Sequence, residues 1–277
     1  MIHLSHRTIV AIAGADRHTF LNGLISNNSM GLTSGQLRYA VFLTPQGRFL
    51  FDLFFAEDGE RLLLDVEAAR AEDFMRRLRL FKLRSAVEIS AVANLAVHAQ
   101  WEDIPIEKPG IFRDPRLSAM GWRAFLPADA RTSDAALPTY HHHRIGLGVP
   151  ESGLELVPQK SIPLENGLDE LNAIDWEKGC YMGQELTART RYRGLVRKRL
   201  LPLRIEGQAP APGETLMLGT TEAGTLMSVS PMGDIGLGMI RLEHLPPASV
   251  EGLTAGQARL FPSIPAWMRL PEPQPTD

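Results

Sequence analysis

Short apolar stretches with strand-like character dominate the first third of the chain. Residues 8–12 form a β-branched run, and the apolar residues 39–43 and 48–55 lie on either side of a glycine-containing turn. These patterns predict a strand followed by a hairpin, and residues 62–66 predict a further strand. Residues 67–81 instead place apolar side chains at helical spacing. The pattern therefore indicates an α+β fold.

Shorter elements are predicted on both sides of a proline-rich middle segment. Asp16 is the expected N-cap of a short helix that follows the first strand. Strands are expected near residues 87–89, 95–99 and 122–126, and a helix is expected over residues 133–144. The loops and prolines between them are typical of an irregular subdomain.

Short strands separated by glycines replace this pattern from residue 195 onward. Their spacing predicts a small C-terminal β-barrel. We therefore expect a first region over residues 1–194 and a second domain over residues 195–270. Residues 271–277 are rich in proline and are expected to be disordered, because they carry no apolar side chains that could pack a core.

The composition is that of an ordinary soluble globular protein of 277 residues, with 44% apolar and 22% charged residues. No apolar run approaches the roughly 18 residues that a membrane span requires. The start of the chain lacks a secretory signal, so we expect a cytoplasmic location and no membrane contact. The net charge of −3 excludes a general attraction to nucleic acid. Glycine-rich nucleotide-binding motifs and serine-hydrolase motifs are absent from the sequence.

Cys180 is the only cysteine of the chain and its most specific candidate site. One cysteine forms no internal disulfide and offers no Cys-x-x-Cys pair for zinc or for a complete iron–sulfur site, so no metal site is expected. A lone cysteine is often a small buried apolar residue. Here Gly179 and Gly183 flank it, a helix start follows, and Lys178 lies two residues away. This context favours a thiolate that acts as a nucleophile, a metal ligand or a redox sensor.

The residues after the cysteine combine amide, carboxylate and guanidinium groups. Gln184 is interpreted as a hydrogen-bonding residue of the site, whereas Glu185 fits equally well as a carboxylate that stabilises a helix start. A run of six cations follows these residues. Charge runs usually form a solvated face, but in a slightly acidic chain this run also predicts a site for a carboxylate ligand, RNA phosphates or an acidic partner. The six cations of the run are Arg189, Arg191, Arg193, Arg197, Lys198 and Arg199.

Two further features carry chemistry. Asp52 interrupts an apolar strand, and alternation places it on one face with Leu50 and Phe54. It is therefore expected to be buried, either as part of a site or as a structural hydrogen-bond acceptor. Residues 141–143 are three successive histidines. Because three such side chains cannot converge on one ion from a helix, we do not interpret them as a metal site.

The sequence resembles the YgfZ family, a group of folate-binding relatives of the glycine-cleavage T-protein that includes mitochondrial iron–sulfur assembly factors. The resemblance extends over residues 5–265 and is most specific at the signature Lys-Gly-Cys-Tyr-x-Gly-Gln-Glu. It implies a ring of three subdomains around a central folate-sized channel, with two interleaved α+β subdomains in residues 1–194 and a small C-terminal β-barrel. The segments that carry it are residues 14–27, 44–48, 164–167 and 178–185.

The same resemblance implies roles for individual residues. Cys180 would face the channel as the reactive group, and Lys178 would tune its thiol. Asp52 and Glu165 would contact the pterin of tetrahydrofolate. The other residues expected to bind this cofactor are Tyr181, Gln184, Glu185 and Arg189.

We therefore expect a folate-binding accessory protein that supports maturation or repair of [4Fe–4S] proteins, including tRNA-modifying enzymes, and that is not a classical enzyme. Its partners would be iron–sulfur client proteins or assembly factors. A first alternative is a folate-dependent aminomethyl or one-carbon transferase of the T-protein type, although Phe51 and Pro163 replace an acidic residue and an arginine of that pattern. A second alternative is a non-catalytic module that binds RNA or protein through residues 189–199.

Overall fold

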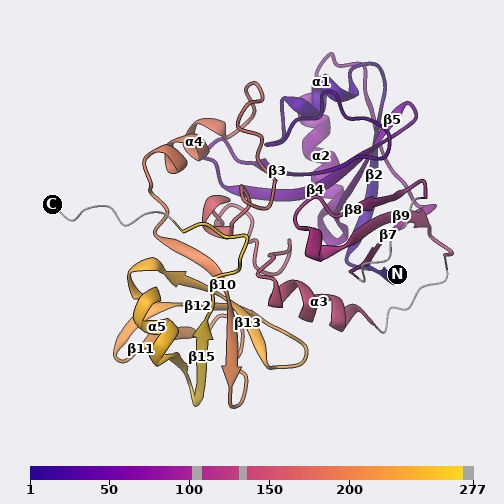
Figure 1. Ribbon diagram of the computed structural model, residues 1–277. Helices are drawn as coiled ribbons and strands as arrows, with labels where there is room; N and C mark the ends of the chain where they lie inside the picture. The colour runs from indigo at the N-terminus through magenta and orange to yellow at the C-terminus, as the bar shows by residue number, and fades with distance from the viewer. Residues whose placement is uncertain (102–107, 131–135, 271–277) are drawn as a thin grey trace.

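The computed structural model describes residues 1–101, 108–130 and 136–270, which form an N-terminal α+β body and a C-terminal barrel (Figure 1). The tail predicted to be disordered, residues 271–277, lies outside the described residues, as does the start of the helix predicted over 133–144. Among the described residues, no helix is long and apolar enough to cross a membrane.

The first layer of the body is an antiparallel five-stranded sheet in the order β3-β4-β5-β2-β6. Helices α1 (Arg17–Asn22) and α2 (Ala71–Lys82) cover one face, where Phe74 of α2 is buried against Phe42 and Phe51. The hairpin and the helix predicted from periodicity are confirmed. The strands are β2 (Arg7–Ala13), β3 (Leu37–Leu43), β4 (Phe49–Asp58), β5 (Arg61–Glu67) and β6 (Glu88–Ala91).

A second antiparallel sheet, in the order β1-β7-β9-β8, packs against the other face of the first. The main apolar core lies between the two sheets, where Tyr39 and Phe54 meet Val97 and Phe125. Burial of this kind contributes about 25 cal/mol for each Å² of apolar surface removed from water. The strands are β1 (Ile2–His3), β7 (Leu95–Gln100), β8 (Ile111–Arg113) and β9 (Trp122–Pro127).

Short helices and loops connect the sheets to the barrel. Helix α3 spans Leu137–Gly146, and Pro138 is its second residue. A proline is well tolerated in the first turn because it has no amide proton to donate there. Helix α4 (Gln184–Tyr192) and the 3₁₀ turn η4 (Leu164–Asn166) also belong to this connection, whereas the 3₁₀ turns η1 (Ala68–Arg70) and η2 (Ser118–Met120) lie within the body.

The C-terminal part is a closed six-stranded barrel in the order β10-β13-β12-β11-β14-β15, which confirms the predicted barrel. Its interior is tightly filled: a Cβ at Gly238 would lie 2.6 Å from Leu203 Cδ1, so a larger residue there would require the Leu203 side chain to move. The elements are β10 (Lys198–Glu206), β11 (Thr215–Leu218), β12 (Thr221–Val229), β13 (Ile235–Arg241), η5 (Leu242–His244), α5 (Leu245–Glu251), β14 (Leu253–Ala255) and β15 (Ala258–Pro262).

Two local expectations differ from the structure. Asp16 stands at the N-cap position of α1, yet its carboxylate accepts a hydrogen bond from the amide of Ala86 at 2.7 Å and none from the helix. Strict alternation predicts Leu50 on the face of Asp52, but Leu50 packs in the cluster under α2. The register of β3 and β4 shifts beside the hairpin turn, and such an irregularity changes which face a side chain takes.

Candidate functional site

Cys180 lies in the loop that leads into α4, and its thiol is exposed and free. The loop is fixed at Gly183, which has a φ of 83° and whose added Cβ would lie 2.5 Å from the carbonyl oxygen of Thr44. Glycine at this position therefore lets the loop touch the turn between β3 and β4. An added Cβ at Gly179 would meet nothing within 4 Å, so the structure explains only one of the two glycines.

Lys178 anchors the same loop from the other side. Its Nζ donates hydrogen bonds to the carbonyl oxygens of Asn22 at 2.7 Å, Ile25 at 2.7 Å and Asn27 at 2.8 Å. Burial lowers the pKa of Lys178 to about 8, against a smaller opposing effect of Asp175. All three protons of the ammonium are thus donated to carbonyl groups, which gives Lys178 a role in holding the loop, and its effect on the thiol stays a prediction.

Further hydrogen bonds join residues 22–27 to the segment before the cysteine. Ser26 Oγ donates to the carbonyl of Ala173 at 2.6 Å, and the amide of Asp175 donates to the carbonyl of Ser26 at 3.0 Å. Asn27 Nδ2 donates to the carbonyl of Asn172 at 2.8 Å. Two of the segments that carry the family resemblance, residues 14–27 and 178–185, are thus joined by Lys178 and by the residues just before it, which holds an exposed cysteine on an ordered loop.

Tyr181 follows the cysteine but points inward. Its ring is buried, and its hydroxyl has no hydrogen-bond partner among the described residues. Burial raises the pKa of Tyr181 to about 12, with a smaller contribution from Asp175. A buried hydroxyl without a partner is costly, so this oxygen is a candidate contact for water or a ligand.

The other residues expected to bind the cofactor are spread over α4 and η4. Glu185 is exposed in the first turn of α4, and Gln184 is half-buried beside it. Arg189 lines a pocket of about 300 Å³ with Arg48 of the hairpin. Burial raises the pKa of the half-buried Glu165, although the nearby Lys198 and Arg48 act in the opposite direction.

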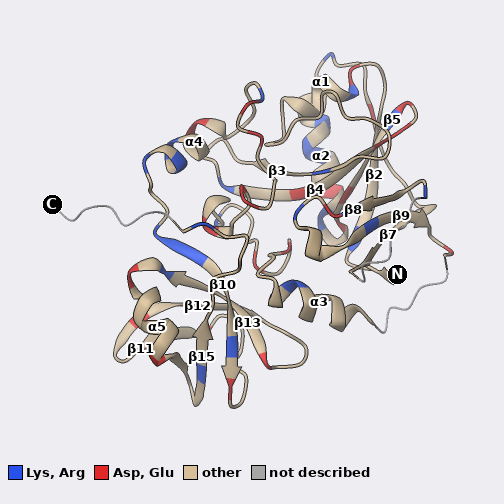
Figure 2. Ribbon diagram, viewed as in Figure 1, with Lys and Arg blue, Asp and Glu red and all other residues tan. Residues whose placement is uncertain are grey.

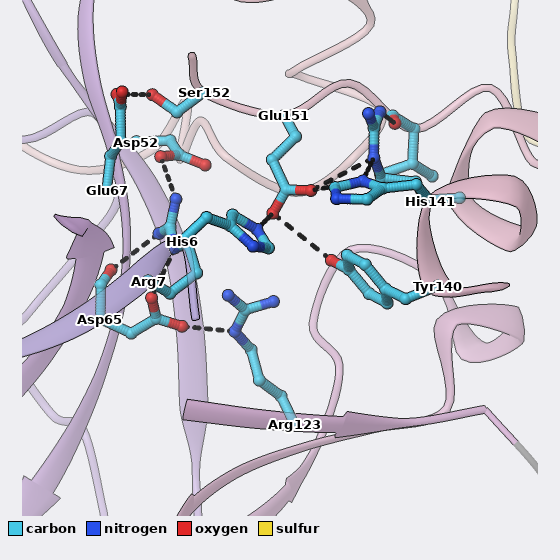
Figure 3. Close-up of polar contacts among 12 residues, drawn as sticks. His6, Arg7, Asp52, Asp65, Glu67, Arg123, Tyr140, His141, Glu151 and Ser152 are labelled. Carbon is cyan, nitrogen blue, oxygen red and sulfur yellow. Dashed lines mark hydrogen bonds and ion pairs between the residues drawn. The ribbon is translucent and has the colours of Figure 1, made fainter. Parts of the chain in front are cut away.

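Asp52 is buried in an ion cluster and has partners on both oxygens. Arg7 Nη1 donates to Asp52 Oδ1 at 2.8 Å (Figure 3). The Tyr39 hydroxyl donates to Asp52 Oδ2 at 3.4 Å. Arg7 also donates to Asp65, and Arg123 Nε donates to the other oxygen of Asp65 at 2.5 Å. The expectation that Asp52 is buried is confirmed, and its observed contacts are those of a structural acceptor.

Sequence reasoning missed most of this cluster. Asp65 interrupts the apolar residues 62–66 in the way that Asp52 interrupts its own strand, so the same signal could have found it. Arg7 and Arg123 gave no such signal, because arginine at a strand end is usually solvated. Only the packing of the two sheets brings these side chains together.

Glu151 extends the polar cluster toward α3. His6 Nε2 lies 2.8 Å from Glu151 Oε1 (Figure 3). Arg144 Nε lies 3.2 Å from Glu151 Oε2. Burial alone would raise the pKa of Glu151, but His6 and Arg144 outweigh it and hold this pKa well below its usual range. Burial lowers the pKa of His141 to about 4, against the attraction of Glu151. His142 and His143 have other partners, the Ser230 hydroxyl and the Ala119 carbonyl.

The predicted cation run divides into exposed and buried members. Figure 2 shows Lys and Arg along α4 and at the start of β10. Arg189, Arg193 and Arg197 are exposed there. Arg199, by contrast, is only 3% exposed and pairs with Glu170, so it is not part of an exposed anion-binding face.

The two sheets and the barrel together define a protein with the aminomethyltransferase T fold. The crystal structure of glycine cleavage system aminomethyltransferase T from Bartonella henselae aligns with a TM-score of 0.73 and 17% identity, and the alignment covers 95% of this chain and 85% of that chain. The model of the CAF17 C-terminal beta-barrel domain matches residues 197–270.

The chain belongs to the IBA57 family of iron–sulfur cluster assembly factors. It is 34% identical to the mitochondrial IBA57 homolog of Pyricularia oryzae, a match that covers 90% of this chain and 73% of that protein. Mitochondrial IBA57 of Mus musculus is 32% identical over 87% of this chain and 77% of its own length. Mitochondrial IBA57 of Homo sapiens is 31% identical, over 95% of this chain and 84% of its own length. The predicted relation to iron–sulfur assembly factors of T-protein type is confirmed.

These relatives contradict the predicted cytoplasmic location, because each of them is named as a mitochondrial protein. That prediction depended on the lack of an apolar secretory segment. Mitochondrial transit peptides are amphipathic and rich in arginine, so the lack of an apolar segment does not distinguish the cytoplasm from mitochondria.

Proposed function

We propose that this protein supports the maturation or repair of [4Fe–4S] proteins, including enzymes that modify tRNA, and that Cys180 is its reactive group. The observation that carries the proposal is a free, exposed thiol on a loop that is hydrogen-bonded to residues 22–27 and lies in close contact with the β3–β4 turn at Gly183. An exposed thiol on an ordered loop can reach a partner without unfolding, as transient ligation of iron, or exchange with a disulfide of a partner protein, requires. The names of the IBA57 relatives support the same process.

Gene deletion followed by complementation tests this function. The deletion is expected to lower the activity of several [4Fe–4S] enzymes, and the wild-type gene is expected to restore it. Cys180→Ala is expected to fail, whereas Glu60→Ala, a change at an exposed turn residue, is expected to restore activity fully. Full rescue by the Cys180→Ala protein would remove the thiol from the function.

Tetrahydrofolate is proposed as a ligand of this protein. The unpartnered hydroxyl of Tyr181 and the half-buried carboxyl of Glu165 fit a polar heterocycle. Asp52 fits less well than the sequence implied, because Arg7 and Tyr39 occupy both of its oxygens. Titration with tetrahydrofolate, followed by tryptophan emission, is expected to saturate in the wild type and to weaken in Tyr181→Phe and Glu165→Gln. If the titration gives no saturable change, folate binding is contradicted, whereas the proposed role of Cys180 is not affected.

The proposed partners are iron–sulfur client proteins or assembly factors, and the exposed side of α4 is the proposed contact. Leu186 and Leu195 are exposed next to Arg189 and Arg193, a combination of apolar and cationic groups that suits an acidic protein surface. Charge reversal at Arg189 and Arg193 is expected to weaken partner binding and to leave the fold intact. A steep fall in affinity for RNA with added salt would favour RNA instead.

A further inference from the structure

A second pocket, of about 460 Å³, lies where the end of α4 meets the segment that follows the barrel. Its walls include Asp169, Trp176, Arg191, Arg199, Trp267 and Arg269. None of the residues proposed to hold folate lines this pocket. Its volume lies within the roughly 300–1,000 Å³ that is typical of small-molecule sites.

The aromatic side chains of this Trp176–Trp267 pocket are fixed in place. Trp267 Nε1 donates a hydrogen bond to the carbonyl of Leu147 at 2.8 Å, and its ring covers Gly167, where an added Cβ would lie 2.8 Å from the ring. The guanidinium of Arg191 lies over Trp176, 4.2 Å from the ring centroid. Planar groups held in this way are stacking surfaces for a flat ring.

Two polar atoms of the pocket have no partner. Arg199 is 3% exposed, and its Nε has no hydrogen-bond acceptor among the described residues, although its other nitrogens donate to Leu164 and Glu170. Asp169 Oδ1 is buried and lacks a donor within the same part of the chain. A buried donor and a buried acceptor without hydrogen-bond partners lower the stability of the fold. A ligand edge with one acceptor and one donor would satisfy both.

The pocket also favours an anion. Three arginines and two acidic residues line it, but Glu170 is already engaged by Arg199 and by the amide of Arg269 at 2.7 Å. The side chains of Arg191 and Arg269 are exposed, and within the described residues neither forms an ion pair. They are therefore available to a phosphate or carboxylate group.

We propose that the Trp176–Trp267 pocket binds a nucleotide, either free or as one residue of an RNA strand. The base would stack on the tryptophan rings and present its donor and acceptor edge to Asp169 and Arg199. The phosphate would lie at Arg191 and Arg269. This inference goes beyond the proposed function and does not depend on it.

Calorimetric titration of the full chain with guanosine and adenosine monophosphates tests the inference, with guanosine, inorganic phosphate, tetrahydrofolate and a short single-stranded RNA as comparison ligands. A nucleotide is expected to bind more tightly than guanosine or phosphate alone. Tighter binding of the RNA identifies RNA as the source, and tighter binding of the monophosphate identifies a free nucleotide; either outcome supports the site. Binding of neither would overturn it, and so would displacement of the nucleotide by tetrahydrofolate.

Two variants separate the parts of the pocket. The double change Arg191→Ala with Arg269→Ala affects exposed side chains and is expected to lower nucleotide affinity about tenfold or more, with little effect on guanosine. Trp176→Leu is expected to lower the affinity for both ligands about fivefold or more. Arg76→Ala, on the exposed side of α2, is the matched control. Nucleotide binding that none of the pocket variants changes would place the ligand elsewhere.

Discussion

Two residues with the same sequence pattern, Asp52 and Asp65, lie in the same ion cluster of the structure. Asp52 and Asp65 both interrupt apolar strands, and both lie in one ion cluster with Arg7. Periodicity could predict that these carboxylates are buried, but not that arginines from two sheets would neutralise them. The same limit applies to Lys178, whose closeness to Cys180 in sequence suggested an electrostatic role. The carbonyl groups that it contacts come from α1 and the loop after it.

The ion cluster predicts a large cost when one carboxylate is removed. Asp65→Ala leaves Arg123 buried without its carboxylate partner, and such a change is expected to lower the free energy of unfolding by about 3–5 kcal/mol. Asp58→Ala removes the exposed pair with Arg61 and is expected to cost about 1 kcal/mol or less. Urea unfolding of both variants measures the difference. Equal losses of stability in the two variants would show that the buried cluster contributes no more than an exposed ion pair.

Lys178 predicts a pH dependence of stability. Its pKa is lowered to about 8 in the fold, so between that value and its ordinary pKa, about 10.4, the unfolded chain binds more protons. The free energy of unfolding of the wild type, relative to Lys178→Arg, is therefore expected to rise above pH 8, by at most about 1.4 kcal/mol per pH unit. Below pH 8 the difference should be constant. Denaturant titrations across this range measure it, and a flat difference throughout would contradict the assigned pKa.

At the scale of elements, the strands and helices could be predicted because each is a local pattern. The hairpin of β3 and β4, helix α2 and the barrel strands follow apolar periodicity and glycine spacing. The face of Leu50 could not be predicted, since it depends on an irregular register. The contact between the cysteine loop and the hairpin turn could not be predicted either, because it joins segments far apart in sequence.

The loop contact predicts a specific effect at Gly183. Gly183→Ala combines a positive φ with a Cβ 2.5 Å from the Thr44 carbonyl oxygen. It is therefore expected to lower the free energy of unfolding by about 1–3 kcal/mol more than the backbone strain of a positive φ alone. Gly219→Ala is the matched control, because Gly219 has a φ of 58° and nothing within 4 Å of an added Cβ. Thermal unfolding of the two variants measures the comparison. A control as unstable as Gly183→Ala would mean that the loop does not need this close approach.

At the scale of the whole molecule, the barrel is tied back to the body. The segment after β15 returns toward α4 (Figure 1), where Trp267 contacts Leu147 and the amide of Arg269 contacts Glu170. The α+β class and the terminal barrel were accessible from sequence. The Trp176–Trp267 pocket was not, because its walls come from three separate parts of the chain.

The proposed function depends most directly on whether the Cys180 thiol can be reached in the folded protein. The measurement is the rate of iodoacetamide alkylation of the native chain, compared with the same chain in urea, with mass spectrometry to count the labelled sites. The structure predicts comparable rates in both states, because the thiol is exposed and free. A thiol that reacts only after unfolding would contradict the account.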